Sequence, residues 1–374
     1  MIYLDNAATT LIKPVSVASA MLQAMRSCAS PGRGGHRAAM RAADTVFRCR
    51  ESAAALFHVP EPERVVFTMN ATHALNIAIG SLAHAGTRVL ISGYEHNAVT
   101  RPLKKLGAEI IVAASPLFDR AACLEAFREK IADAELVVCT MVSNVFGFIL
   151  PIREIAALCR EKGVQLIVDA SQAAGILDID FEALGAAFVC MPGHKGLFGP
   201  QGTGILLCGE DGEPLISGGS GSDSLLQEMP AYLPDRLEAG THNVTGIAGL
   251  CAGIDYVRAC GIGEICKKEQ ELLRYTEELL KKEEQIELFV GPEGSQSGVL
   301  SLRIRGRDCD EAAAFLSEQN ICLRSGLHCA PLAHRSAGTL QTGTLRLSFS
   351  PFVRKEEVKS CCKRIRELSR KNAE

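Results

Sequence analysis

Short apolar segments that alternate with helical segments between residues 64 and 208 constrain the fold of this 374-residue chain more than any other feature. The apolar segments are rich in Val, Ile and Leu and have the length of buried strands. Strands that are apolar on both faces are typical of parallel sheets covered by helices on each side. The pattern therefore predicts a mainly parallel α/β sheet of seven strands. The expected strands are 64–68, 88–92, 108–113, 136–141, 164–168, 186–190 and 204–208.

The sequence changes character after about residue 250. A charged helical run is followed by short strands and a further helix, which is the mixed order of a smaller α+β domain. A length of 374 residues also suggests about two domains. The glycine- and serine-rich segment 217–224 is expected to be a site loop rather than a linker, because α/β sequence resumes after it. The elements expected here are a helix at 263–285, strands at 286–290 and 298–306, a helix at 310–319, and strands at 321–325 and 344–349.

Composition and charge exclude several classes of function. The chain has 40 Lys and Arg residues against 43 Asp and Glu residues, so it lacks the basic excess that binds nucleic acid or an anionic membrane. No signal peptide and no run of about 18 apolar residues is visible, so no membrane span is expected.

Fifteen cysteines in an unsecreted chain favour a reducing compartment, and a cytoplasmic location is expected. Most of them, such as Cys139, Cys190 and Cys208 in apolar segments, should be small buried side chains. None has the C-x-x-C spacing of simple metal sites, and no metal is expected.

Chemically useful side chains follow the ends of the expected strands. His96, Asn144 and Asp169 each come directly after such a segment, and Gln172 lies three residues beyond Asp169. Lys195 lies in the glycine-rich segment "PGHKGLFGPQGTG" after the strand at 186–190. Ligands of open α/β sheets bind at the carboxyl ends of the strands, so we expect these side chains to meet there.

The combination fits the requirements of pyridoxal 5′-phosphate (PLP). Lys195 can bind the PLP aldehyde as a Schiff base, and Asp169 can pair with the pyridinium nitrogen so that the ring withdraws electrons. The imidazole of His96 can stack on the ring. The segment "MNATHALN" at 69–76 opens a helix whose free N–H groups and positive dipole end suit a phosphate.

Each of these features also has an ordinary structural explanation. A strand-end aspartate is often a helix N-cap, a single loop histidine need not touch a ligand, and "GHKGLFGPQGTG" could be a glycine-rich turn. This last segment lacks the G-x-x-x-x-G-K-[ST] pattern of a nucleotide-binding P-loop. A non-catalytic binding or scaffold protein on the same fold is a further alternative.

Ten motifs in order resemble the class V aminotransferase superfamily of fold-type I PLP enzymes, and within it the cysteine desulfurases and selenocysteine lyases. The motif R-x-G-x-H-C-A is the feature specific for this subgroup. The ten motifs are "YLDNAATT" (3–10), "PGRGGHR" (31–37), "NATHALN" (70–76), "EHNAV" (95–99), "VSNVFG" (142–147), "VDASQAAG" (168–175), "PGHKGLFGPQGTG" (192–204), "EAGTHN" (238–243), "RSGLHCA" (324–330) and "TLRLSF" (344–349).

The resemblance implies a fold-type I PLP-dependent transferase with two domains. The large PLP-binding α/β domain would span residues 15–252. The smaller α+β domain would consist of residues 1–14 and 253–374 and would carry the loop of Cys329 together with Arg346.

The resemblance also implies roles in cofactor binding. Lys195 would hold PLP and then move protons, Asp169 would pair with the pyridine nitrogen, and Gln172 would bond the phenolic oxygen. His96 would stack on the ring, and Asn144 would lie near it. The residues implied for the phosphate are Ala71 and Thr72 at the helix start, His194, and Thr241 from the other subunit of a homodimer.

Arg346 and Cys329 are implied to act on the substrate. Arg346 would grip the substrate carboxylate, for which a bidentate guanidinium is well shaped, with Asn144 nearby. Cys329 would attack the substrate sulfur and keep it as a persulfide, which requires an exposed, mobile thiolate whose pKa a neighbouring cation or the adjacent His328 could lower. Two other interpretations of Cys329 are a buried loop cysteine and a zinc ligand alongside Cys322, His328 and His334.

The resulting hypothesis is a homodimeric PLP-dependent cysteine desulfurase that converts L-cysteine to L-alanine and passes sulfur to an acceptor protein or a thiol. A selenocysteine lyase acting on L-selenocysteine shares every site residue and is not separated by sequence. Transamination or β-elimination would need no Cys329.

The chain departs from the family pattern at three positions. Pro192 stands where many relatives carry Ser or Thr for a phosphate contact, His73 follows the phosphate turn, and His242 stands where Pro is common. Ser220 or Ser222 is a possible replacement for the missing phosphate contact. The departures leave the substrate less determined than the cofactor.

Overall fold

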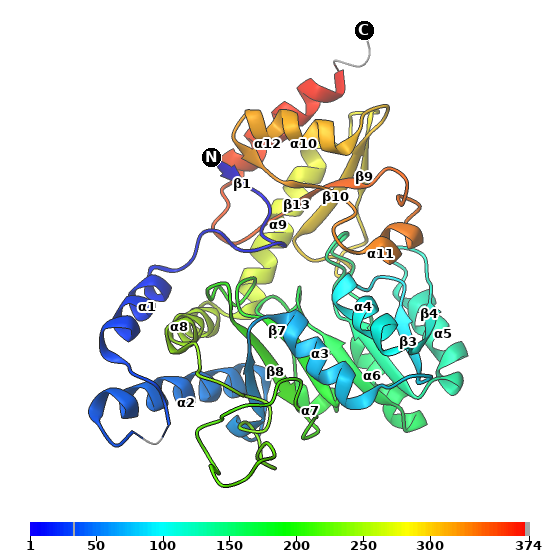
Figure 1. Ribbon diagram of the computed structural model, residues 1–374. Coiled ribbons are helices and arrows are strands. Elements are labelled where there is room, and N and C mark those ends of the chain that lie inside the picture. The colour runs from blue at the N-terminus through cyan, green and yellow to red at the C-terminus, as the bar shows by residue number, and fades with distance from the viewer. Residues whose placement is uncertain (33, 371–374) are drawn as a thin grey trace.

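A seven-stranded sheet in the order β2-β8-β7-β6-β5-β3-β4 forms the centre of the larger part of the molecule (Figure 1). The computed structural model describes residues 1–32 and 34–370; Arg33 of the "PGRGGHR" motif and residues 371–374 lie outside them. Only β8 runs antiparallel to its neighbours, so the predicted mainly parallel sheet is confirmed. The strands are β2 Val65–Thr68, β3 Arg88–Ser92, β4 Glu109–Ala113, β5 Leu136–Thr140, β6 Gln165–Asp169, β7 Phe188–Pro192 and β8 Gly204–Cys208.

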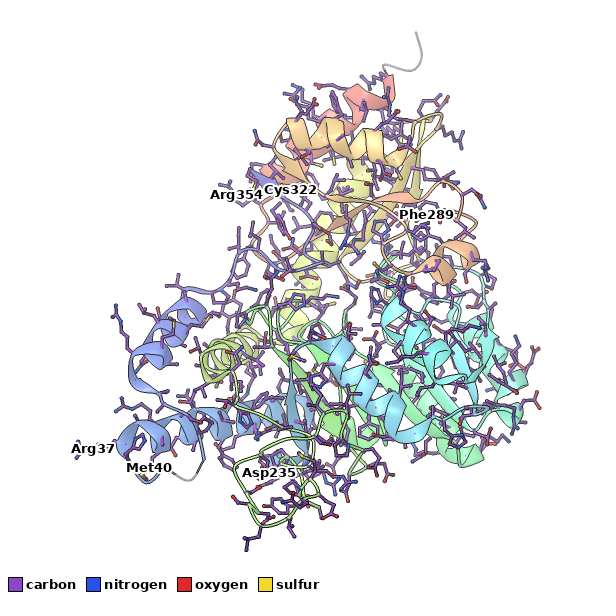
Figure 2. The ribbon with its side chains drawn as sticks, in the orientation of Figure 1. Arg37, Met40, Asp235, Phe289, Cys322 and Arg354 are labelled. Carbon is purple, nitrogen blue, oxygen red and sulfur yellow. The ribbon has the colours of Figure 1, made fainter. Side chains whose placement is uncertain are left out.

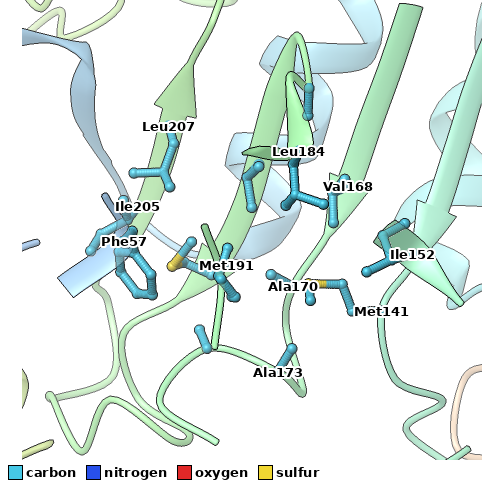
Figure 3. Packing of buried hydrophobic residues seen from close by; sticks show 14 of the residues in the cluster. Phe57, Met141, Ile152, Val168, Ala170, Ala173, Leu184, Met191, Ile205 and Leu207 are labelled. Atoms are coloured by element: carbon cyan, nitrogen blue, oxygen red, sulfur yellow. The ribbon is translucent and has the colours of Figure 1, made fainter. Parts of the chain in front are cut away.

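Both faces of this sheet are buried, as the apolar segments predicted. Successive residues of β3 point to opposite sides: Leu90 joins one hydrophobic cluster, whereas Val89 and Ile91 join another. Figure 3 shows part of the first cluster, where Phe57 of α2 lies against Ile205 of β8. The helices of this part are α1 Val15–Ser27, α2 Arg37–Phe57, α3 Ala71–Leu82, α4 Asn97–Leu106, α5 Arg120–Lys130, α6 Ile152–Lys162, α7 Phe181–Leu184 and α8 Val244–Cys260, with 3₁₀ turns at Pro62–Arg64 and Ile131–Asp133.

A second, smaller body lies above the large sheet in Figure 1 and is reached through the long helix α9. Its core is a separate hydrophobic cluster that includes Leu4 from the N-terminal segment. The domain division expected after residues 14 and 252 is still a proposal, and α8 runs across residue 252. The elements are β1 Ile2–Tyr3, α9 Ile262–Leu280, β9 Ile286–Phe289, β10 Val299–Ile304, α10 Cys309–Glu318, β11 Ile321–Cys322, β12 Arg324–Gly326, α11 Pro331–Ser336, β13 Thr344–Ser348 and α12 Lys355–Arg370.

The expectation of one strand over residues 321–325 is wrong. The segment divides at Leu323 into β11, which pairs in parallel with β1, and β12, which pairs antiparallel with β13. The N-terminal segment competes for the first half of this stretch, and a sequence pattern does not reveal such a partner more than 300 residues away. Figure 2 shows Cys322 at this N-terminal side and Phe289 of β9 on the other side of the small body.

All fifteen cysteines lie among the described residues and are free thiols. Cys139, Cys190 and Cys208 are buried as expected, and only Cys260 and Cys329 are exposed. In residues 1–32 and 34–370, no helix has the combination of length and apolar composition that a membrane span needs.

A buried ion cluster ties α2 and β2 to the segment before α8. Both carboxylate oxygens of Glu238 accept hydrogen bonds from the guanidinium of Arg50, and Oε2 also contacts Nε2 of His242 at 2.5 Å. Burial by itself would raise the pKa of the Glu238 carboxyl, but the Arg50 charge outweighs it and lowers the pKa to about 2. Glu238 is therefore a carboxylate at neutral pH.

We predict that Glu238→Gln lowers the free energy of unfolding by about 3–5 kcal/mol at neutral pH, because it leaves the Arg50 charge buried without a counter-ion. Urea unfolding at fixed protein concentration measures the loss. The contribution of Glu238 should persist as long as its carboxyl stays ionised and fade as the pH falls from about 4 towards its folded pKa of about 2.

The matched control is Glu125→Gln, which removes the exposed partner of Arg128. This change should cost less than about 1 kcal/mol, as exposed ion pairs do. Equal losses for the two variants would contradict the role assigned to the buried cluster.

Candidate functional site

A cavity of about 210 Å³ opens at the carboxyl ends of β5, β6 and β7, beneath the small body. It receives side chains from both parts of the molecule, as the strand-end argument predicted. Every residue predicted for the site lines this cavity except Thr241. The lining residues among those predicted are Ala71, Thr72, His96, Asn144, Asp169, Gln172, His194, Lys195, Cys329 and Arg346.

Lys195 is held in a tight turn that follows β7. A Cβ atom at Gly175, which has a φ of +83°, would lie 2.2 Å from the carbonyl oxygen of Gly196, so the loop after β6 packs on this turn only because both positions are glycine. Among the described residues, the Lys195 amine makes no hydrogen bond or ion pair. Burial is the main cause that lowers the pKa of this amine, to about 8, against the opposing influence of Asp169. A lysine with such a pKa has a substantial neutral, nucleophilic fraction near neutral pH.

Asp169 at the end of β6 and His96 beyond the end of β3 face the same cavity, with β5 between the two strands. Asp169 ends β6, is 3 % exposed, and accepts a hydrogen bond from the Ser171 N–H at 2.9 Å. The ring of His96 caps α4, with Nδ1 accepting from the Ala98 N–H at 3.0 Å. Burial lowers the pKa of His96, while the Asp169 carboxylate opposes that shift. His96 is thus a neutral ring whose proton is on Nε2.

Arg346 links the small body to the floor of the cavity. Its side chain is 1 % exposed, and it donates to the Asn144 carbonyl oxygen at 2.9 Å and to Asp5 Oδ1 at 2.6 Å. The buried Nε of Arg346 has no hydrogen-bond partner within the described residues. A buried donor without an acceptor is costly, and the Arg346 side chain that carries this atom lines the cavity.

The N-terminal segment forms another wall of the cavity. Ala7 and Ala8 line it, and Gln172 Nε2 donates to the Ala7 carbonyl oxygen at 2.9 Å. Ala7 and Ala8 belong to the motif "YLDNAATT", for which the sequence predicted no role. Arg324 also lines the cavity and was missed, although it belongs to the quoted motif "RSGLHCA".

The start of α3 lies at the opposite end of the cavity. Asn70 caps this helix by accepting from the His73 N–H at 2.9 Å, and Ala71 and Thr72 follow it into the first turn. His194 lies nearby, with Nδ1 3.0 Å from Thr9 Oγ1, and burial lowers its pKa to about 4. The helix terminus therefore supplies N–H donors beside a neutral imidazole, an arrangement that suits an anion.

Thr241 lies apart from this cavity. It lines a second cavity, of about 690 Å³, to which His194 and Asn70 also contribute. Ser220 lines a third one, together with Thr241, and its hydroxyl lies 2.9 Å from that of Ser222. Within one chain, neither serine replaces the contact that Pro192 cannot make.

Cys329 is exposed at the cavity in a tightly held turn. His328 and Cys329 have φ angles of +51° and +56°, which non-glycine residues rarely adopt. The Cys329 carbonyl oxygen accepts from the Asn97 N–H at 2.8 Å, and the His328 carbonyl oxygen accepts from Asn144 Nδ2 at 2.8 Å. The backbone of Cys329 is therefore anchored on both sides, next to the cap residue His96.

Both ring nitrogens of His328 face partners other than the Cys329 thiol. Nδ1 of His328 lies 3.3 Å from His334 Nε2, and Nε2 of His328 lies 3.4 Å from the Arg324 carbonyl oxygen. Burial is the largest cause that lowers the pKa of His328, to about 2, so the ring is neutral.

Comparison with known proteins gives a consistent result. The family described as aminotransferase class-V matches residues 2–361. A probable cysteine desulfurase of Methanothermobacter thermautotrophicus is 32 % identical and covers 98 % of this chain and 94 % of its own, and a cysteine desulfurase of Salmonella agona is 35 % identical over 88 % and 84 %. The apo structure of a cysteine desulfurase from Thermococcus onnurineus superposes with a TM-score of 0.90 at 31 % identity, covering 99 % of this chain and 94 % of that one.

We predict that Lys195 in the PLP-free protein becomes reactive with a midpoint near pH 8, because burial disfavours its charged form. Lysines in model peptides titrate near about 10.4, so Lys195 should be acylated selectively between about pH 7 and 9. Brief acetic anhydride labelling at a series of pH values, followed by peptide mass spectrometry, gives the midpoint. A Lys195 midpoint no lower than that of the surface lysines in the same digest would contradict the burial argument.

Proposed function

Because this chain belongs to the aminotransferase class-V family, we propose that it is a PLP-dependent cysteine desulfurase. It converts L-cysteine to L-alanine and holds the sulfur as a persulfide on Cys329. The observation that carries the proposal is the convergence of Lys195, Asp169 and the exposed Cys329 thiol on one cavity. The names of the relatives support the same activity.

The residues around the cavity fit PLP. One end has the N–H groups of the α3 start for a phosphate, and the middle has a buried carboxylate, Asp169, for a pyridinium nitrogen. Lys195 supplies an amine that has no other partner within residues 1–32 and 34–370, and His96 supplies a neutral ring from the cap of α4. When bound, PLP would supply an electron sink for the substrate's α-carbon.

Arg346 and Asn144 orient the substrate. The unpartnered Nε of Arg346 and its neighbouring Nη2 offer donors for the α-carboxylate of L-cysteine, while Asp5 and the Asn144 carbonyl oxygen hold the guanidinium in place. Lys195, whose lowered pKa leaves part of its amine neutral, takes the proton from the α-carbon and can return it to the product.

Cys329 receives the sulfur. Its thiolate attacks the substrate sulfur, the bond between the substrate β-carbon and sulfur breaks, and the β-carbon gains a proton to give L-alanine. The enzyme then carries Cys329–S–SH, so one sulfur atom has moved and no external oxidant or reductant is needed. Two equivalents of an added thiol, or a sulfur-acceptor protein, release the sulfur and restore the Cys329 thiol.

The active form proposed is a homodimer. Thr241 lies outside its own chain's Lys195 cavity but beside one that shares His194 and Asn70 with it, so a second copy at this face could bring Thr241 to the partner's phosphate end. Fifteen free thiols support a reducing compartment such as the cytoplasm.

We predict that the PLP-loaded protein releases L-alanine and sulfide in equal amounts from L-cysteine and a thiol reductant, and that Cys329→Ala lowers both rates by at least about 100-fold, as loss of a nucleophile does. Alanine and sulfide assays, with PLP content measured by absorbance, provide the test. Cys260→Ala is the matched control, because Cys260 is the other exposed cysteine.

Full activity in Cys329→Ala would overturn the persulfide step and favour elimination or transamination. Activity on L-selenocysteine but not on L-cysteine would assign the reaction of a selenocysteine lyase. A protein that takes up no PLP would overturn the enzyme assignment as a whole.

We also predict that mixing the Lys195→Ala and Thr241→Ala variants restores activity. If Thr241 serves the partner's site, one site of each mixed dimer combines an intact Lys195 with an intact Thr241. Exchange of subunits in equal amounts, followed by the alanine assay, should then recover about a quarter of the wild-type rate, because half of the dimers are mixed and each has one intact site. If the mixture is no more active than the Thr241→Ala variant that it contains, Thr241 does not act across a dimer interface.

A further inference from the structure

Two buried histidines lie behind the turn that carries Cys329. The rings of His328 and His334 are inclined by only 10°, with centres 5.5 Å apart and facing nitrogens 3.3 Å apart. The distance between the ring centres is close to the sum of the nitrogen–nitrogen distance and the radii of the two rings. The rings therefore lie nearly edge to edge in a common plane. This arrangement aligns an N–H of one ring with the lone pair of the other.

The pair is extended at both ends. His334 Nδ1 lies 2.7 Å from Thr339 Oγ1, and His328 Nε2 faces the Arg324 carbonyl oxygen at 3.4 Å, the weakest link. A carbonyl oxygen can only accept, so His328 must have its proton on Nε2. His328 Nδ1 then accepts from His334 Nε2–H, and His334 Nδ1 accepts from the Thr339 hydroxyl. The reverse direction would place two acceptors against each other at Arg324.

Both rings stay neutral in this arrangement. His334 is fully buried, and its ring also packs against Phe146, with centres 5.7 Å apart. Burial lowers the pKa of His334 to about 4 and is the main cause of the still lower pKa of His328. A neutral pair forms the single directed chain, because a proton on Nδ1 of His328 would set two N–H donors against each other and a proton on Nδ1 of His334 would reverse the link to Thr339.

The hydrogen-bond chain ends at the Arg324 carbonyl oxygen, in the segment that carries Cys329. Two consecutive non-glycine residues, His328 and Cys329, are in the left-handed region, which persists only where surrounding structure holds it. Asn144 and Asn97 hold the backbone of this turn from the large body. The His328 ring is a further attachment: it contacts His334 of α11, a helix whose Ala333 belongs to the hydrophobic cluster of the large body.

We propose that this directed hydrogen-bond chain holds the turn of Cys329 in its sulfur-accepting position, an inference that rests on the proposed function. His334 and Thr339 are thereby positioning residues: they touch neither substrate nor PLP and act through His328. The members of the chain, in order of donation, are Thr339, His334, His328 and the Arg324 carbonyl oxygen.

The kinetic test uses PLP-loaded Thr339→Val, His334→Leu and His334→Gln. Valine removes only the hydroxyl and leucine removes the ring, whereas the glutamine amide can still donate from near the position of Nε2. Thr342→Val is the matched control, since the Thr342 hydroxyl bonds the backbone carbonyl oxygens of Thr339 and Gly343 and contacts neither histidine ring. Steady-state rates and single-turnover persulfide formation on Cys329 are measured for each.

Thr339→Val and His334→Leu should lower kcat and persulfide formation by about 10-fold or more with KM for L-cysteine and PLP content nearly unchanged, since a small misplacement of a reacting group is costly. His334→Gln should recover much of the loss. The positioning role would be overturned if Thr339→Val had the same kinetics as Thr342→Val. It would also be overturned if the variants lost PLP, raised KM and lowered kcat together and His334→Gln gave no rescue.

Nitrogen-15 NMR spectra of the histidines in the holoenzyme test the hydrogen-bond chain directly. This test does not depend on which reaction the enzyme catalyses. The wild type should show His328 and His334 as neutral rings with the proton on Nε2 throughout pH 6 to 8, and Thr339→Val should change the His334 signals more than Thr342→Val does. A proton on Nδ1 of either ring, or a charged ring, would overturn the chain. A wild type with this chain but no alanine release would instead refute the proposed function.

Discussion

The buried guanidinium of Arg346 is the interaction on which the geometry of the site depends. It starts from β13 of the small sheet and is bound to Asp5 of the N-terminal segment and to the carbonyl oxygen of Asn144 beyond β5. Three parts of the chain that are distant in sequence therefore meet at one side chain. Because a buried charge must be compensated, the N-terminal segment, the small body and the sheet edge are fixed relative to one another. The cavity is the space that this arrangement leaves.

The cavity is lined by more cationic groups than anionic ones. Lys195, Arg324 and Arg346 provide cationic groups, and Asp169 provides a buried carboxylate. The histidines near the cavity all have pKa values lowered by burial, so they act as neutral donors and acceptors rather than as charges. An anionic cofactor and an amino-acid carboxylate both fit this environment, whereas a cationic ligand would not.

The position of Cys329 is fixed by contacts with neighbouring segments of the fold. Asn97 and Asn144 reach it from the large body, and the His328 ring ties it to His334 of α11, which packs against Phe146 of the same body. The thiol is thus exposed on a backbone that is held firmly, instead of on a loose loop. Sulfur transfer from such a turn depends on side-chain rotation and on accurate placement of the substrate, because the backbone offers little reach.

The sequence by itself determined the seven strands, the identity of the strand-end residues and the family pattern, because apolar periodicity and the order of motifs are local or linear properties. It could not determine which distant segments compete for the same partner. The pairing of residues 321–322 with the N-terminal strand and the ion pair of Asp5 with Arg346 depend on contacts across more than 300 residues, and the ring contacts of His328, although close in sequence, depend on the fold of the turn that carries them. Tertiary structure decided these features, since the protonation state and direction of a buried polar group are set by whichever groups the fold places against it.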